Sequence, residues 1–167
     1  MKRILVIGSS GAGKSTFSRR LGKIVGIEVV HLDKLHWKPN WTEPSKDEWQ
    51  KILAEAVKKD SWIMDGNYSR TIEMRVAACD TVIFLDMPRV VCIYRILQRV
   101  AFYYGKHRPD MAEGCNEQFD WKFLVWVWNY PNRSKPIVEK ILKEYEGEKT
   151  VVRLSSKRAA ENFLINL

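Results

Sequence analysis

A glycine-rich turn near the amino terminus carries the residues whose types and spacing point most directly to chemistry. Gly8–Ser15 reads GSSGAGKS, the pattern GxxxxGK followed by Ser or Thr, after a short apolar run at Ile4–Ile7 and before a predicted helix. Such a loop turns several backbone N–H groups toward one anion, and the helix adds its positive dipole end. We predict an ATP site in which Lys14 reaches the β- and γ-phosphates and Ser15 places its hydroxyl on Mg²⁺. The residues expected to bind the nucleotide are Gly8, Ser9, Ser10, Gly11, Ala12, Gly13, Lys14, Ser15 and Thr16.

Two carboxylates follow neighbouring predicted strands. Asp33 ends a predicted strand at Ile27–Leu32, and Asp65 ends one at Trp62–Met64. The carboxyl ends of parallel strands meet at one edge of a sheet, so both side chains should face the phosphate loop. We expect Asp65 to hold a water of the magnesium shell or to orient the nucleophile, with a plain Asp-Gly turn as the alternative. We expect Asp33 to bind an acceptor hydroxyl or act as its general base, with capping of the next loop as the alternative.

Two arginines share one face of a predicted helix that runs from about Arg89 to Tyr103. Arg95 and Arg99 are four residues apart, and the helix around them is apolar on several sides. Guanidinium groups that meet at phosphate oxygens stabilise the charge that develops in phosphoryl transfer. We assign both to the site, with a solvated basic face as the alternative.

A polar segment at about 105–120 interrupts the regular pattern. It contains Gly105, Pro109 and Gly114, which suits a lid that excludes water and delivers charge. Arg108 is its best candidate contact, and Arg133 after the next helix is a weaker one. An ordinary long surface loop is the alternative.

Predicted strands and helices alternate along the chain and must position these residues. Parallel strands joined by crossover helices have right-handed connections and carry helices on both faces. We predict an α/β fold of three layers, α/β/α, in which a five-stranded parallel sheet carries a P-loop and a short lid insertion. The remaining predicted elements are strands at Thr81–Leu85 and Lys149–Leu154, and helices at 14–25, from Ser45 to about Val57, at Ser69–Ala78, near 120–129, near 134–146 and at Ser156–Leu167, with a loop at 33–44.

The tryptophans divide into two groups. Trp37 and Trp41 flank Pro39 after Asp33, where they either form a stacking wall for a planar acceptor or pin the loop to the domain. The others fall in predicted helices or strands and are expected to pack in the core. They are Trp49, Trp62, Trp121, Trp126 and Trp128.

Composition sets the frame for these assignments. A chain of 167 residues and 19.6 kDa with 46% hydrophobic residues predicts one globular domain over residues 1–167. The net charge of +8 and pI near 9.4 call for a polyanionic partner, which could be a nucleic acid, an anionic membrane or a phosphorylated small molecule. No apolar run reaches the roughly 20 residues that span a bilayer, so no membrane partner is expected. Three widely spaced cysteines indicate free thiols and a cytoplasmic protein. We expect the protein to be a monomer or a weak dimer.

Together these motifs resemble the P-loop nucleoside-monophosphate kinases, such as adenylate kinase, in order along the whole chain. Asp33 with Leu35 resembles the Asp-x-Leu of the family's acceptor site, and Asp65-Gly66 followed by Arg70 resembles its Asp-Gly-Phe-Pro-Arg segment. Arg95 and Arg99 match the arginine pair on the helix after the fourth strand. The resemblance implies ATP and Mg²⁺ as cofactors and phosphoryl transfer as the activity.

Three segments are more narrowly similar to a bacterial branch of adenylate-kinase-like proteins called topology modulation proteins, which are linked to DNA supercoiling and flagellin expression. They are His31–Trp37, Asp65–Tyr68 and Arg108–Cys115. The chain departs from the larger kinases where His36 replaces an arginine and where Arg70 comes one residue late. Only one short helix fits between Asp33 and Ser61, so the acceptor-binding segment at about 33–60 is reduced.

Three functions follow from these observations. The first is an ATP-dependent kinase acting on a nucleotide or another small acceptor, with Lys14, Arg95, Arg99 and Arg108 sharing the transition-state charge and Asp33 facing the acceptor. The second is a DNA-binding protein regulated by nucleotide, which the charge and the branch support, although no DNA-binding motif is present. The third is a plain ATPase.

Overall fold

The first strand supplies two hydrophobic cores, one on each face of the central sheet. In the computed structural model, which describes residues 1–167, β1 (Arg3–Gly8) turns Ile4 and Val6 into one core and Leu5 and Ile7 into the other. All four side chains are fully buried. Successive side chains of a strand point to opposite faces, so a continuous apolar run marks a strand covered on both sides.

Five parallel strands form the sheet, in the order β2-β3-β1-β4-β5. β1 lies in the middle, so the loop that follows it opens between the ends of its two neighbours, where open α/β sheets bind ligands. The predicted five-stranded parallel sheet is confirmed. Its other strands are β2 (Val29–His31), β3 (Trp62–Asp65), β4 (Thr81–Leu85) and β5 (Thr150–Leu154).

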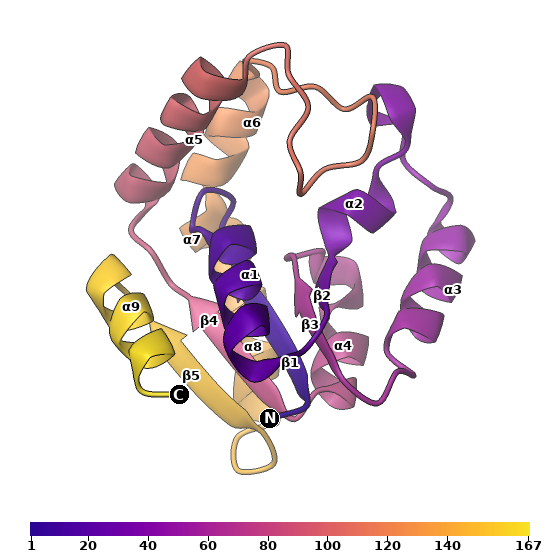
Figure 1. Ribbon diagram of the computed structural model, residues 1–167, viewed down its shortest axis with the longest axis vertical. Coiled ribbons are helices and arrows are strands. Elements are labelled where there is room, and N and C mark those ends of the chain that lie inside the picture. Colours follow the sequence, from indigo (N-terminus) through magenta and orange to yellow (C-terminus); the bar gives the residue numbers. More distant parts are fainter.

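Helices cover both faces of this sheet, which confirms the three-layer fold (Figure 1). One core receives side chains from α1 (Lys14–Val25), α5 (Arg89–Tyr103), α6 (Trp121–Trp128) and α9 (Lys157–Ile165). The other receives them from α3 (Lys46–Ala56), α4 (Ile72–Ala78) and α8 (Lys135–Glu144). The predicted cap of α3 is present, since Ser45 Oγ accepts from the Glu48 N–H at 3.1 Å.

Some predicted bounds were wrong. The segment 33–44 is not a plain loop, because α2 (Leu32–His36) and the short 3₁₀ helix η1 (Pro39–Trp41) occupy most of it. β2 is accordingly shorter than predicted. The predicted helix near 134–146 is preceded by α7 (Tyr130–Arg133), and the helix predicted at Ser69–Ala78 begins as a 3₁₀ turn, η2 (Ser69–Thr71).

The tryptophan assignment was right for β3 and α3 and wrong for α6. Trp49 and Trp62 are buried. Trp121, Trp126 and Trp128 are 68%, 40% and 42% exposed.

The sequence of α6 explains this error. It is apolar all round, but the helix buries only Leu124 and Val127. Cations cover two of its exposed rings instead, with Arg89 4.1 Å from the centre of Trp128 and Arg133 4.2 Å from that of Trp126. Arg133, the weaker candidate contact for the phosphate site, stacks on Trp126 in this structure.

The segment 104–120 leaves α5, arches over to the α2 side of the molecule and returns to α6 (Figure 1). There Met111, Ala112 and Cys115 are buried in a small cluster with Trp37 and Trp41. The Asn40 N–H also donates to the Gly114 carbonyl at 3.3 Å. The tryptophans therefore connect this segment to the one that follows Asp33.

No helix combines the length and apolar character needed to cross a bilayer. The three cysteines are free, as predicted, and all three are buried.

Candidate functional site

The loop after β1 has the close-fitting backbone that its glycines predict. Gly8, Gly11 and Gly13 all have positive φ. A Cβ on Gly11 would lie 2.3 Å from the Cys92 carbonyl oxygen, so the loop touches the first turn of α5 at a distance that only glycine allows. Ser9 Oγ inside the loop is buried with no hydrogen-bond partner. A backbone cradle with a spare hydroxyl fits a phosphate chain.

Lys14 begins α1 and folds back over this loop. Its ammonium donates to the Ser9 carbonyl at 3.0 Å. Burial lowers the pKa of Lys14, and the negative charges of Asp33 and Asp65 oppose that shift, while the positive charge of Arg99 adds to it. Both predicted carboxylates and one of the predicted arginines therefore lie within electrostatic reach of Lys14.

Asp65 is held by a partner that the sequence reasoning missed. His31 ends β2 beside Asp65, the end of β3, in the parallel register. Its Nδ1 lies 2.9 Å from both carboxylate oxygens, and Asp65 is 4% exposed. This pairing fixes the carboxylate beside the phosphate loop.

Asp33 lies in the first turn of α2, one element later than predicted. The Tyr68 hydroxyl donates to its carboxylate at 2.7 Å. Burial raises the pKa of Tyr68, and the negative charge of Asp33 raises it further, so this phenol stays a donor. The carboxylate is half-buried and keeps its remaining lone pairs for another donor, such as a hydroxyl.

Arg75 explains how Tyr68 reaches Asp33. This guanidinium is fully buried and donates to the carbonyls of Gly66, Asn67 and Tyr68 at 3.0, 2.6 and 3.0 Å. Tyr68 itself has a φ of 31°, which few non-glycine residues adopt. The arginine that supports this turn is Arg75, whereas Arg70, which the resemblance singled out, is exposed.

Aromatic rings surround the Asp33 side of the site. His36 lies 4.7 Å from Trp49 and 4.6 Å from Tyr68 between ring centres. Burial lowers the pKa of His36, so the neutral ring is favoured. Trp37 and Trp41 contact each other and the 104–120 segment, which supports the loop-pinning interpretation of these two residues.

The two arginines of the predicted pair bind different partners. Arg95 Nη1 donates to the Ala12 carbonyl in the phosphate loop at 2.9 Å. Arg99, one turn later, binds Glu117 at 3.0 Å, and Arg108 binds the other oxygen of the same carboxylate at 2.9 Å. Arg108 is 6% exposed and so lies inside the 104–120 segment. Sequence reasoning missed Glu117, which carries no local motif.

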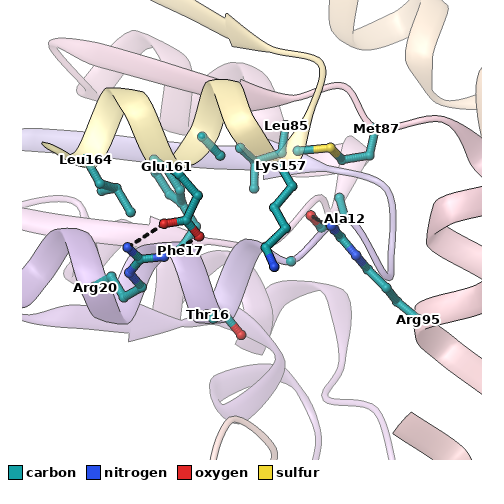
Figure 2. Close-up of a pocket in the computed structure, with 12 residues that line it drawn as sticks. Ala12, Thr16, Phe17, Arg20, Leu85, Met87, Arg95, Lys157, Glu161 and Leu164 are labelled. Carbon is teal, nitrogen blue, oxygen red and sulfur yellow. Dashed lines mark hydrogen bonds and ion pairs between the residues drawn. The ribbon is translucent and has the colours of Figure 1, made fainter. Parts of the chain in front are cut away.

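A pocket opens on the side of the phosphate loop that faces α9. Ala12, Gly13 and Thr16 line it together with residues of α1, α9 and the end of β4. Figure 2 shows Arg95 at the loop end of this pocket and the Arg20–Glu161 pair, at 2.6 Å, at its other end. Lys157 reaches in from α9 between them. Half of the twelve lining residues are hydrophobic, which suits a flat, partly apolar group attached to a phosphate chain.

The donor set also fits Mg²⁺ as the sequence predicts it. The structure contains no cluster of three or more His, Cys, Asp or Glu side chains that could hold a metal by themselves. Mg²⁺ on a nucleotide takes one or two protein oxygens and completes its shell with phosphates and water. Ser15 at the start of α1 and Asp65 at the end of β3 offer those two oxygens.

No protein-family model and no curated protein matches this chain. Solved structures do match. The shikimate kinase of Acinetobacter baumannii in complex with shikimate has a TM-score of 0.65 at 16% identity, over 99% of this chain and 90% of that one. This decides the fold. The chain has the fold of the P-loop kinases.

Two further structures agree with that fold. The deoxyadenosine kinase of M. mycoides with bound dATP has a TM-score of 0.54 at 15% identity, over 98% of this chain and 97% of that one. The shikimate kinase of Bacteroides thetaiotaomicron has a TM-score of 0.55 at 15% identity, over 99% and 95%. Phosphoryl-transfer folds of this kind host several acceptors, so the acceptor must be argued from the site.

Proposed function

We propose that this protein is an ATP-dependent phosphotransferase that moves the γ-phosphoryl group of ATP to a nucleotide or another small acceptor. The observation that carries the proposal is the glycine-rich loop after β1, over which Lys14 folds at 3.0 Å from the Ser9 carbonyl and to which Arg95 donates at 2.9 Å, with Asp65 at the end of the neighbouring strand. The nucleoside of ATP would occupy the pocket between α1 and α9, and its phosphates would follow Gly8–Thr16 toward Lys14. Asp33 would face the acceptor on the opposite side of the loop.

The transfer itself needs little covalent chemistry from the protein. The acceptor oxygen forms a bond to the γ-phosphorus while the bond between that phosphorus and the β,γ-bridging oxygen breaks, and ADP leaves. The Asp33 carboxylate takes the proton of an acceptor hydroxyl, oriented by Tyr68. Lys14, Arg95, Arg99 and Arg108 stabilise the charge spread over the phosphoryl oxygens. Ser15 and Asp65 would hold Mg²⁺, which would supply further positive charge to the phosphate chain.

ADP release tests the proposal. Wild-type protein with Mg·ATP is supplied with nucleoside monophosphates, nucleosides and small hydroxylated compounds, one at a time. We expect turnover that depends on an added acceptor and is nearly abolished by Lys14→Ala, while the exposed Lys23→Ala in the same helix leaves it unchanged. Turnover that persists in Lys14→Ala contradicts the mechanism. If the rate of ADP release is the same with and without every added acceptor, the protein is a plain ATPase.

We include membership of the topology modulation branch in this proposal because of the resemblance of His31–Trp37, Asp65–Tyr68 and Arg108–Cys115 to that branch, and Trp37 packs against Met111, Ala112 and Cys115. The branch's link to DNA is tested separately by fluorescence anisotropy with duplex DNA at low salt. Phosphate contacts make affinity fall steeply with salt, so an absence of binding there excludes DNA as the partner.

A further inference from the structure

Glu117 lies where the 104–120 segment closes on itself. Its N–H donates to the Lys106 carbonyl at 3.0 Å, and its carbonyl accepts from the Gly105 N–H at 2.8 Å. The two ends of the segment are therefore paired, and the Glu117 side chain starts from a fixed backbone. That side chain is 5% exposed. A carboxylate so buried needs partners, since burying an unpaired charge is strongly unfavourable.

Each oxygen of this carboxylate binds a different arginine. Oε1 accepts from Arg99 Nη2 of α5 at 3.0 Å, and Oε2 accepts from Arg108 Nη1 of the segment at 2.9 Å. Without Glu117 the two guanidinium groups would repel each other in a partly dry environment. Burial lowers the pKa of Arg99, and the positive charge of Arg108 lowers it further, while Glu117 opposes both. The negative charge of Glu117 therefore offsets the repulsion between Arg99 and Arg108.

The cluster keeps unused hydrogen-bond donors. Nε of Arg99 and Nε of Arg108 are buried and have no hydrogen-bond partner. An arginine has five N–H donors, so Glu117 uses only part of what the pair can donate. Asp110 Oδ2 also lies 3.5 Å from Arg108 Nη2, so the two arginines and two carboxylates carry no net charge. The positive charge of Arg99 nevertheless acts on Lys14 at the phosphate loop.

We propose that Glu117 is a positioning residue for phosphoryl transfer, which holds Arg99 and Arg108 together so that both guanidinium groups meet the phosphate chain as one unit. This inference rests on the proposed function. Simple charge counting gives the opposite expectation, because a carboxylate beside a phosphate site repels the phosphate. The sign of the effect on phosphate affinity therefore separates positioning from repulsion.

Calorimetric titration with inorganic tripolyphosphate and Mg²⁺ measures that sign without any acceptor. We expect Glu117→Gln, which keeps the shape but loses the charge, to bind about tenfold more weakly than wild type, as supporting residues of ligand groups commonly do. The matched control is Glu113→Gln, an exposed carboxylate of the same segment, which should bind like wild type. Unchanged or tighter binding by Glu117→Gln overturns the proposal. Because this titration needs no turnover, it tests the role of Glu117 even where no acceptor supports phosphoryl transfer.

Kinetics separates positioning from a merely structural role. With an acceptor that supports turnover, Glu117→Gln should lower kcat more than it raises the KM for ATP. Combining it with Arg108→Lys should cost little beyond either change alone, because both act through the same guanidinium. Fully additive losses in kcat contradict the proposal. Circular dichroism and thermal unfolding confirm folding, and Glu117→Asp replaces the glutamine variant if that variant unfolds.

Discussion

Tyr68 donates a 2.7 Å hydrogen bond to Asp33 from a backbone conformation with φ of 31°. Arg75 makes this possible, because its guanidinium binds three successive carbonyls of the same turn. The buried Arg75 thus stabilises the turn at Tyr68, and Tyr68 in turn holds the Asp33 carboxylate. Backbone strain of this kind persists where the surrounding structure over-determines it, which is common at functional sites.

Removing the phenol should therefore affect the site more than the fold. For Tyr68→Phe we expect kcat with a productive acceptor to fall about tenfold, because Asp33 loses the group that orients it. The free energy of unfolding should fall by only about 1 kcal/mol, since water can replace the donor at a half-buried carboxylate. Steady-state kinetics and urea denaturation measure the two effects. Tyr103→Phe, on the exposed end of α5, is the control, and wild-type kcat in Tyr68→Phe would contradict the orienting role of Tyr68.

Arg75 should matter for stability as much as a core residue does. Burial lowers its pKa to about 10, and its donors are spent on backbone carbonyls with no carboxylate nearby. Arg75→Met leaves those buried carbonyls unpaired, so we expect a loss of about 3 to 5 kcal/mol in the free energy of unfolding. The exposed Arg70→Met should stay within about 0.5 kcal/mol of wild type. Equal effects in urea denaturation would show that the turn does not depend on Arg75.

This contrast shows where sequence reasoning reaches its limit. The phosphate loop was predictable, because its pattern lies within eight consecutive residues whose backbone forms the site. The choice between Arg70 and Arg75 was not, because it depends on the 3₁₀ turn at Ser69–Thr71 and the positive φ of Tyr68. Sequence spacing alone does not reveal either feature.

Long-range pairing explains the other omissions. Glu117 stands in a polar stretch and acquires its partners only when that stretch folds against α5. The pocket beside the phosphate loop needs α9, whose Lys157 and Glu161 are far from the loop in sequence. Buried strands such as β1 and β4 were predictable from their apolar runs, whereas α6 was equally apolar and yet leaves three tryptophans exposed.

His36 should make stability depend on pH. Its folded pKa lies below the ordinary value of 6.5 because burial disfavours the charged ring. Below that value the unfolded chain takes up a proton that the folded ring still rejects, so stability falls as pH decreases through this window and is fully present above it. His36→Phe removes this titration. Urea denaturation at pH about 5 and about 7.5 should show a steeper acid loss in wild type than in the variant. Parallel pH profiles would contradict the assignment.

An alanine at Gly11, with an alanine at Gly26 as its control, tests whether the phosphate loop needs its close contact with α5. Both have positive φ, +78° and +69°, so Gly→Ala at either position costs about 1 to 2 kcal/mol of backbone strain. A Cβ at Gly26 meets nothing within 4 Å, whereas one at Gly11 would lie 2.3 Å from the Cys92 carbonyl oxygen. Gly11→Ala must therefore push α5 away from the loop, and Arg95 with it. We expect this variant to lose more stability than Gly26→Ala.

Gly11→Ala should also lose most of its affinity for Mg·ATP, because the displaced α5 carries the arginine that binds the Ala12 carbonyl. Gly26→Ala, at the far end of α1, should bind like wild type. Thermal unfolding with and without Mg·ATP measures stability and binding together, since a ligand that binds only the folded state raises the midpoint. Equal midpoint shifts in the two variants would mean that contact between the loop and α5 is not needed for nucleotide binding.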